Sequence, residues 1–121
     1  MEIFKEMFAT AGRLNRQSHF KYQMIWVMLV AISTIISSLT IEFLTGVPDS
    51  DWSQMVKMFL FYVGLFGFFI ITVRRLHDLN LSGAFAAAVF VPVIGVFFLF
   101  YLFAAAGTAG ANKYGEEPPE T

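Results

Sequence analysis

Three stretches of the chain lack charged side chains and consist mainly of apolar residues. They are Tyr22–Ile41 with 20 residues, Met58–Val73 with 16, and Leu79–Asn112 with 34. An α-helix rises about 1.5 Å per residue, so about 20 apolar residues cross a hydrocarbon core about 30 Å thick. The second stretch reaches this length if the Lys57 side chain extends its ammonium group to the membrane interface.

This pattern predicts an all-α membrane protein that forms a single domain over residues 1–121. Its three transmembrane helices are expected over 21–43, 54–74 and 84–106. None of them has the polar face that a surface helix of a soluble domain carries. The first segment begins too late and is too long for a cleavable signal peptide, so it is expected to be an uncleaved anchor.

The third apolar segment allows two topologies, because Pro92 and Gly95 stand at its centre. Proline removes a backbone donor, and glycine loosens packing. One alternative is a kinked spanning helix, which leaves the polar tail, 107–121, outside. The other is a re-entrant hairpin with arms 84–91 and 96–106, which returns the tail to the cytoplasm.

The N-terminal arm, residues 1–19, is expected to contain a short interfacial helix over 2–11. Gly12 would end this helix, and Ser18 would cap the first membrane helix. The apolar positions of the arm fall at helical spacing, and they are Ile3, Phe4, Met7, Phe8 and Ala11.

The composition supports a membrane protein, with 57% hydrophobic, 17% aromatic and 14% charged residues. Soluble domains have about 25% charged residues. A net charge of −1 argues against a nucleic-acid partner and against a disordered chain. Because the chain has no cysteine, disulfides and thiolate-based metal sites are excluded, and no cofactor is predicted.

Basic residues orient the predicted helices, since lysine and arginine are enriched on the cytoplasmic side of membranes. Six of the eight stand in the arm and in the 74–83 loop, which are therefore predicted to be cytoplasmic: Lys5, Arg13, Arg16, Lys21, Arg74 and Arg75. The loop with Asp49 and Asp51 would lie outside. No ionisable residue falls deep within a predicted helix, which argues against ion-coupled transport.

Small residues are spaced for close helix packing in all three apolar segments, as at Ser33 and Ser37, Gly64 and Gly67, or Ala84 and Ala88. Packing within the chain is the simpler interpretation. The alternative is a homo-oligomer, which would form a pore lined by serine and threonine or a membrane-perturbing assembly.

Polar residues converge on the predicted cytoplasmic face from segments 12–19 and 74–83, and a cytoplasmic tail would join them there. We expect Asp78 to pair with Arg13, Arg16 or Arg74, and the face to bind anionic lipid or a protein partner. The candidate binding residues are Arg13, Arg16, His19, Arg74, Arg75, His77, Asp78, Asn112 and Tyr114.

No catalytic or phosphate-binding motif accompanies this cluster. His77 and Asp78 are adjacent, and neighbouring residues diverge by about 100° on a helix, so they form no evident dyad. Two histidines and Asp78 are also too few for a zinc site. We therefore expect a non-enzymatic protein without a metal, and a lipid-modifying enzyme that uses His77 is the less favoured alternative.

Four motifs of the chain together resemble the bacterial inner-membrane proteins grouped as domain of unknown function 805. The motifs are Gly12-Arg13-x-x-Arg16, Arg74-Arg75-Leu76-His77-Asp78-x-x-x-Ser82-Gly83, Pro92-x-x-Gly95 and Gly107-Thr108-x-Gly110-x-Asn112-x-Tyr114-Gly115-x-x-Pro118. Members usually have glycine where Asn80 stands and an aromatic pair in place of Ala84-Phe85. The resemblance implies a multi-pass protein of the bacterial inner membrane, and it implies no particular activity.

Overall fold

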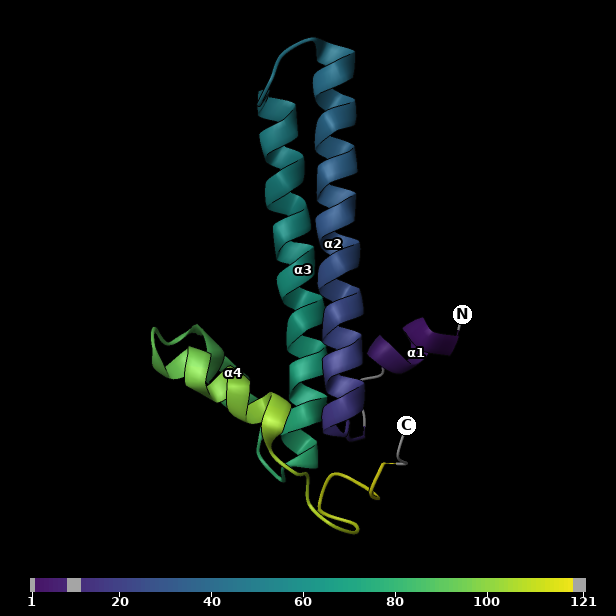
Figure 1. The fold of residues 1–121 in the computed structure, drawn as a ribbon, viewed down its shortest axis with the longest axis vertical. Coiled ribbons are helices and arrows are strands. Elements are labelled where there is room, and N and C mark those ends of the chain that lie inside the picture. Colours follow the sequence, from purple (N-terminus) through teal and green to yellow (C-terminus); the bar gives the residue numbers. More distant parts are fainter. Residues whose placement is uncertain (1, 9–11, 119–121) are drawn as a thin grey trace. The chain divides into compact units, whose positions relative to one another are not determined.

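The computed structural model describes residues 2–8 and 12–118, in which every regular element is a helix (Figure 1). The elements are α1 (Glu2–Phe8), α2 (Arg16–Thr45), α3 (Asp51–Asp78), the 3₁₀ helix η1 (Gly83–Phe90) and α4 (Ile94–Ala104). Extended pairing in the described ranges is limited to one isolated bridge between Asn112 and Gly115. The predicted all-α class is confirmed.

Two helices, α2 with 30 residues and α3 with 28, are long and apolar enough to cross a membrane. They contain the predicted segments 21–43 and 54–74. The cap predicted at Ser18 is wrong, because the Asn15 Oδ1 atom accepts a hydrogen bond from the Ser18 backbone N–H at 2.7 Å. Asn15 therefore caps α2 three residues earlier.

The chain divides into two compact units, a middle unit of Met24–Phe68 and a terminal unit of Met1–Gln23 with Phe69–Thr121. In the middle unit the indole N–H of Trp26 donates to the Gly64 carbonyl at 2.9 Å. A Cβ atom on Gly67 would overlap the Trp26 ring, and one on Gly64 would lie 3.2 Å from Val30. These two glycines therefore allow α2 and α3 to approach closely within the chain.

Polar side chains also join α2 to α3 in the middle unit. The hydroxyls of Ser38 and Ser53 lie 3.0 Å apart, and the Ser38 hydroxyl donates to Glu42 at 3.1 Å. The Lys57 ammonium on α3 lies 3.9 Å from the Glu42 carboxylate on α2 and pairs with Asp49 of the connecting loop at 2.7 Å. Gly64, Gly67, Ser38 and Ser53 thus take part in packing between α2 and α3.

The third apolar segment does not form one helix through 84–106, so the prediction of a single spanning helix there is wrong. The segment folds as η1 and α4, which pack against each other in the terminal unit around a turn at Val93, where φ is 67°. Pro92 interrupts the backbone donors before this turn. A Cβ atom on Gly95 would overlap the Val89 carbonyl, so glycine permits the close return of the chain.

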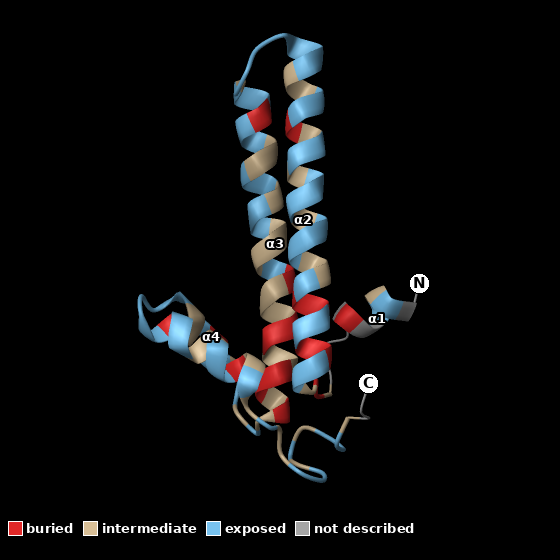
Figure 2. Ribbon diagram, viewed as in Figure 1, coloured by how far each residue is buried: buried red, intermediate tan, exposed pale blue. Residues whose placement is uncertain are grey.

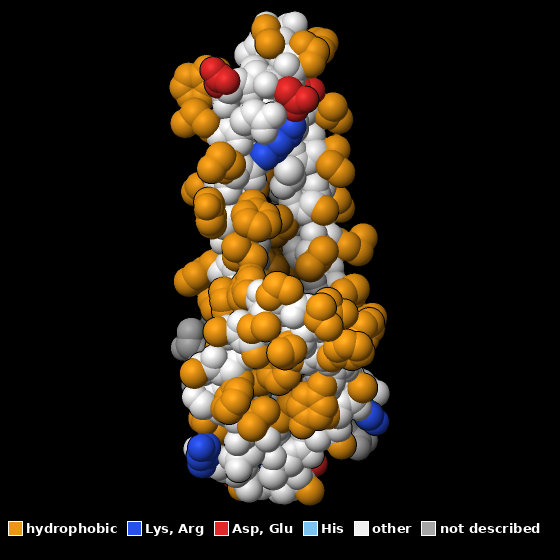
Figure 3. All heavy atoms as spheres, turned by 90° about the vertical axis from the view of Figure 1, so that its left-hand side faces the viewer, with side chains coloured by type: hydrophobic (Ala, Val, Ile, Leu, Met, Phe, Trp, Pro, Cys, Tyr) orange, Lys and Arg blue, Asp and Glu red, His pale blue; other side chains and the backbone are white. Residues whose placement is uncertain are grey.

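Hydrophobic side chains cover the exposed face of the η1–α4 hairpin (Figure 3). The exposed large residues there are Phe85, Phe90, Val91, Val93, Ile94, Val96, Phe97, Phe100 and Tyr101. Its inner side packs on a small core around Leu76, Ala86 and Leu102. Figure 2 marks the buried positions along the helices.

The turns beside the hairpin and the arm stand at residue types that favour turn conformations. Asn80 has a left-handed φ of 59°, and the Ser82 hydroxyl accepts from the Ala84 N–H at 3.3 Å. Gly12 has a φ of 96°, which favours glycine. Helix α1 covers part of the predicted 2–11 helix, and residues 9–11 lie outside the described ranges. The interfacial location of α1 and the single-domain organisation stay predictions.

The hairpin predicts that both termini lie on one side of the membrane. We expect alkaline phosphatase fused after the last residue to be inactive and a fluorescent protein fused there to be bright, because the phosphatase needs the oxidising periplasm. The matched control is phosphatase inserted between Val47 and Pro48, which should be active. An active C-terminal phosphatase fusion would contradict the hairpin topology.

Candidate functional site

The site is built around Asp78, whose carboxylate lies between two arginines from different parts of the terminal unit. Its Oδ1 accepts from the Arg13 Nε at 3.0 Å, and its Oδ2 accepts from the Arg75 Nη1 at 2.6 Å. Both arginine side chains are 0% exposed and that of Asp78 is 3% exposed. Buried charges are tolerated only when they are paired and hydrogen-bonded, and this arrangement satisfies both conditions.

Arg75 uses its remaining donors on backbone carbonyls from the arm and from the end of α4. Its guanidinium donates to Leu102 at 2.8 Å, to Leu14 at 3.2 Å and to Ala105. The last carbonyls of a helix lack partners within the helix, so the guanidinium completes the C-terminus of α4. Arg75 thereby ties the arm and the hairpin to α3.

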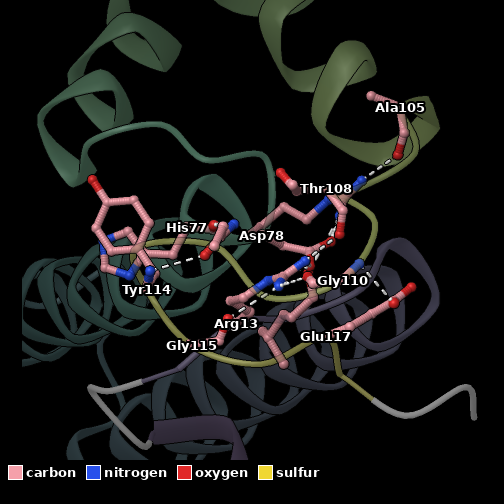
Figure 4. A network of polar contacts seen from close by, with 12 residues as sticks. Arg13, His77, Asp78, Ala105, Thr108, Gly110, Tyr114, Gly115 and Glu117 are labelled. Atoms are coloured by element: carbon pink, nitrogen blue, oxygen red, sulfur yellow. Dashed lines mark hydrogen bonds and ion pairs between the residues drawn. The ribbon is translucent and has the colours of Figure 1, made fainter.

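Arg13 holds the tail in the same way (Figure 4). Its guanidinium donates to the carbonyls of Thr108 at 2.5 Å, Gly110 at 2.6 Å and Gly115 at 3.2 Å. The Thr108 N–H in turn donates to the Asp78 carbonyl at 2.8 Å. The tail therefore folds back onto the face formed by the arm and the end of α3.

The tail loop adds side-chain contacts with His77. The Asn112 amide donates to the His77 carbonyl at 2.9 Å, and its Oδ1 accepts from the Tyr114 N–H at 2.9 Å. The Tyr114 and His77 rings stack with centroids 3.9 Å apart and an interplanar angle of 5°. A Cβ atom on Gly107 would overlap the Asp78 carboxylate, so the tail can pass Asp78 closely only at a glycine.

Six of the nine predicted site residues meet in this network, namely Arg13, Arg75, His77, Asp78, Asn112 and Tyr114. Asp78 was expected to pair with Arg13, Arg16 or Arg74. The first pairing is confirmed, whereas the second arginine is Arg75, which lies three positions before Asp78 on the same face of α3.

The other three predicted residues lie outside the carboxylate's hydrogen bonds. Arg16 is exposed and donates to the Ala104 carbonyl at 3.2 Å. His19 is fully buried, with its ring 4.9 Å from that of Phe103 and its Nε2 atom 3.5 Å from the Gln23 amide nitrogen. Arg74 is half-buried, and its carbonyl accepts from the Leu14 N–H at 3.1 Å.

We call this network, formed by Arg13, Arg75 and Asp78 with the tail residues that they hold, the clamp, because its contacts serve to fix the fold. Asp78 binds two guanidiniums and not the His77 ring, which is stacked on Tyr114, so the described residues contain no His–Asp dyad. The residues that sequence reasoning missed act mainly through their backbone carbonyls, as at Thr108 and Gly110. No residue-type signal marks a carbonyl acceptor, although the glycine-rich pattern of the tail indicates an irregular loop.

Comparison with known proteins agrees with this arrangement of motifs. Residues 7–116 match the family described as protein of unknown function, DUF805. The chain belongs to this family. The matched range includes every residue of the clamp, from Arg13 in the arm to Tyr114 and Gly115 in the tail.

Two curated relatives of this DUF805 protein are called inner membrane protein YhaI, one from Escherichia coli strain K12 and one from Escherichia coli O157:H7. Each is 30% identical over 118 residues, which cover 98% of this chain and 92% of the relative. No solved structure matches significantly. The family, the relatives and the two long apolar helices identify a membrane protein.

The clamp predicts different roles for two arginines of one motif. Replacing Arg13 by lysine keeps the charge but loses the planar fork, so at least two hydrogen bonds to the tail are lost, at a cost of about 3 kcal/mol. Hydrogen exchange at the Thr108, Asn112 and Gly115 amides should become faster. Arg16→Lys is the matched control and should leave this exchange unchanged. Unchanged protection in Arg13→Lys would show that Arg13 does not hold the tail.

Proposed function

We propose that this DUF805 protein is a non-enzymatic, multi-pass protein of the bacterial inner membrane whose cytoplasmic face binds anionic phospholipid headgroups. The proposal rests on the distribution of its basic side chains. Of the eight lysines and arginines, only Lys57 belongs to the middle unit, where it pairs with Asp49. The exposed basic residues of the terminal unit form what we call the basic rim, namely Lys5, Arg16, Lys21 and Lys113.

The clamp removes two arginines from the residues that the sequence suggested for binding anionic lipid. Arg13 and Arg75 are buried and already bound to Asp78 and to carbonyls, so they are poor candidates for contact with a headgroup. Lipid binding therefore falls to the basic rim. Each basic residue near an anionic membrane surface contributes about 1 kcal/mol.

The surroundings of Lys21 favour contact with lipid over contact with a soluble partner. Lys21 stands between exposed Phe20 and buried Tyr22 on α2, and its ammonium lies 5.1 Å from the Tyr22 ring centroid. Exposed apolar residues continue along α2 from Met24. A cation beside aromatic rings, at the start of a long apolar helix, is typical of the membrane interface.

The two alternatives receive less support. The hydroxyls of Thr34, Ser37 and Thr40 donate to carbonyls of their own helix, so their hydrogen atoms are not available to a second copy of the chain. For a catalytic His77, the described residues offer no carboxylate partner at Asp78, because Asp78 is bound to Arg13 and Arg75.

The proposal predicts that removal of rim charges weakens anionic-lipid binding. Lys21→Gln combined with Lys113→Gln should lower the affinity for phosphatidylglycerol about 30-fold, as expected for the loss of about 2 kcal/mol. Native mass spectrometry of the purified full chain with phosphatidylglycerol gives the measurement.

Lys57→Gln is the matched control, because it removes one lysine from the middle unit and should leave the affinity unchanged. Equal phosphatidylglycerol binding by the wild type and the double variant would refute the proposed role of the rim.

A further inference from the structure

A cavity of about 460 Å³ in the terminal unit lies between the start of α2 and the tail. Ligand sites generally have volumes of about 300–1,000 Å³, so the cavity is large enough for a small polar group. Its polar lining includes Asn15, Arg16, Gln17, Asp78, Thr108 and Glu117.

Among the described residues that line the cavity, one cation and one anion are not neutralised by the clamp. Asp78 is already paired with Arg13 and Arg75. Arg16 is exposed and uses one guanidinium nitrogen on the Ala104 carbonyl. The Glu117 side chain is fixed by the Gly110 N–H, which donates to its Oε2 at 2.9 Å. The charges available to a ligand are therefore +1 at Arg16 and −1 at Glu117.

The cavity also adjoins an apolar surface. Phe20 lies one helical turn after Arg16 on α2, is 54% exposed, and packs with its ring 5.7 Å from that of Phe103. Residues four apart share one face of a helix. A polar ligand in the cavity can therefore continue into a hydrocarbon chain along Phe20.

We propose that this cavity binds the zwitterionic headgroup of phosphatidylethanolamine. The guanidinium of Arg16 and the amide of Gln17 hold the phosphate, because a guanidinium fork matches phosphate oxygens. The Glu117 carboxylate accepts hydrogen bonds from the primary ammonium group. This site shares Arg16 with the basic rim, but its test is separate from that of phosphatidylglycerol binding by the rim lysines, because its decisive contact is with a carboxylate.

The same phosphoethanolamine chemistry is available from a lipid or from a soluble compound. The full chain, purified in detergent, is titrated with dihexanoyl phosphatidylethanolamine, with the matching phosphatidylglycerol and phosphatidylcholine, and with glycerophosphoethanolamine. Native mass spectrometry counts the bound molecules. Equal binding of glycerophosphoethanolamine and phosphatidylethanolamine would support the headgroup site with a soluble source, whereas tighter binding of the lipid supports the membrane source.

The decisive variant is Glu117→Gln, which keeps an acceptor for the Gly110 N–H but removes the charge. Loss of one charge-assisted hydrogen bond should weaken phosphatidylethanolamine binding about tenfold and leave phosphatidylglycerol binding unchanged or stronger. Phosphatidylcholine, whose trimethylammonium cannot donate, should bind the wild type as weakly as phosphatidylethanolamine binds Glu117→Gln.

Glu116→Gln is the matched control, because it removes the same charge from an exposed neighbour that does not line the cavity. It should retain wild-type binding. Equal affinity of the wild type for all three lipids, or equal losses in Glu116→Gln and Glu117→Gln, would overturn the proposal. If the Lys21→Gln, Lys113→Gln double variant kept its affinity for phosphatidylglycerol, that result would refute the role of the basic rim and would leave the phosphatidylethanolamine site unaffected.

Discussion

The terminal unit depends on the burial of one carboxylate between two guanidiniums. Asp78 with Arg13 and Arg75 carries a net charge of +1, although none of the three side chains is more than 3% exposed. Among the residues that the structure describes, no third charged side chain pairs with this group. Instead, backbone carbonyls point their negative ends at the guanidiniums, three at Arg13 and three at Arg75. Carbonyl groups of the arm, of the end of α4 and of the tail thus take the place of water around a buried charge. This explains why the irregular, glycine-rich tail folds against the end of α3.

This electrostatic requirement also explains the topology of the third apolar segment. The carbonyls of Leu102, Ala105 and Thr108 must reach guanidiniums that stand beside Asp78 at the end of α3. A helix that crossed the membrane would carry those carbonyls to its far side. Between Asp78 and Leu102 the chain must therefore go out and return, and the turn at Val93 with the close approach at Gly95 provides the reversal.

Sequence patterns predicted the parts of this fold that local rules govern. The charge-free stretches located α2 and α3. Hydropathy could not separate a spanning helix from a hairpin, because both bury the same apolar residues. The Asn15 cap was missed because neighbouring Asn and Ser side chains compete for the same helix end. The motifs indicated which polar segments converge, but carbonyl acceptors have no residue-type signature.

The residues that carry the family resemblance therefore divide into two physical groups. Arg13, Asp78 and Gly107 are enclosed by the fold, and a change at any of them alters folding before it alters binding. His77 is partly buried, and one face of its ring is stacked on Tyr114, so its replacement also changes the packing of the tail. Loss of function on its replacement would not by itself indicate acid–base chemistry. Arg16 is different, because it is exposed at a cavity that Glu117 also lines. In this protein, charges that are exposed and unpaired among the described residues, such as Arg16, are the candidates for ligand recognition. Buried and paired charges such as Arg13 and Asp78 hold the fold together.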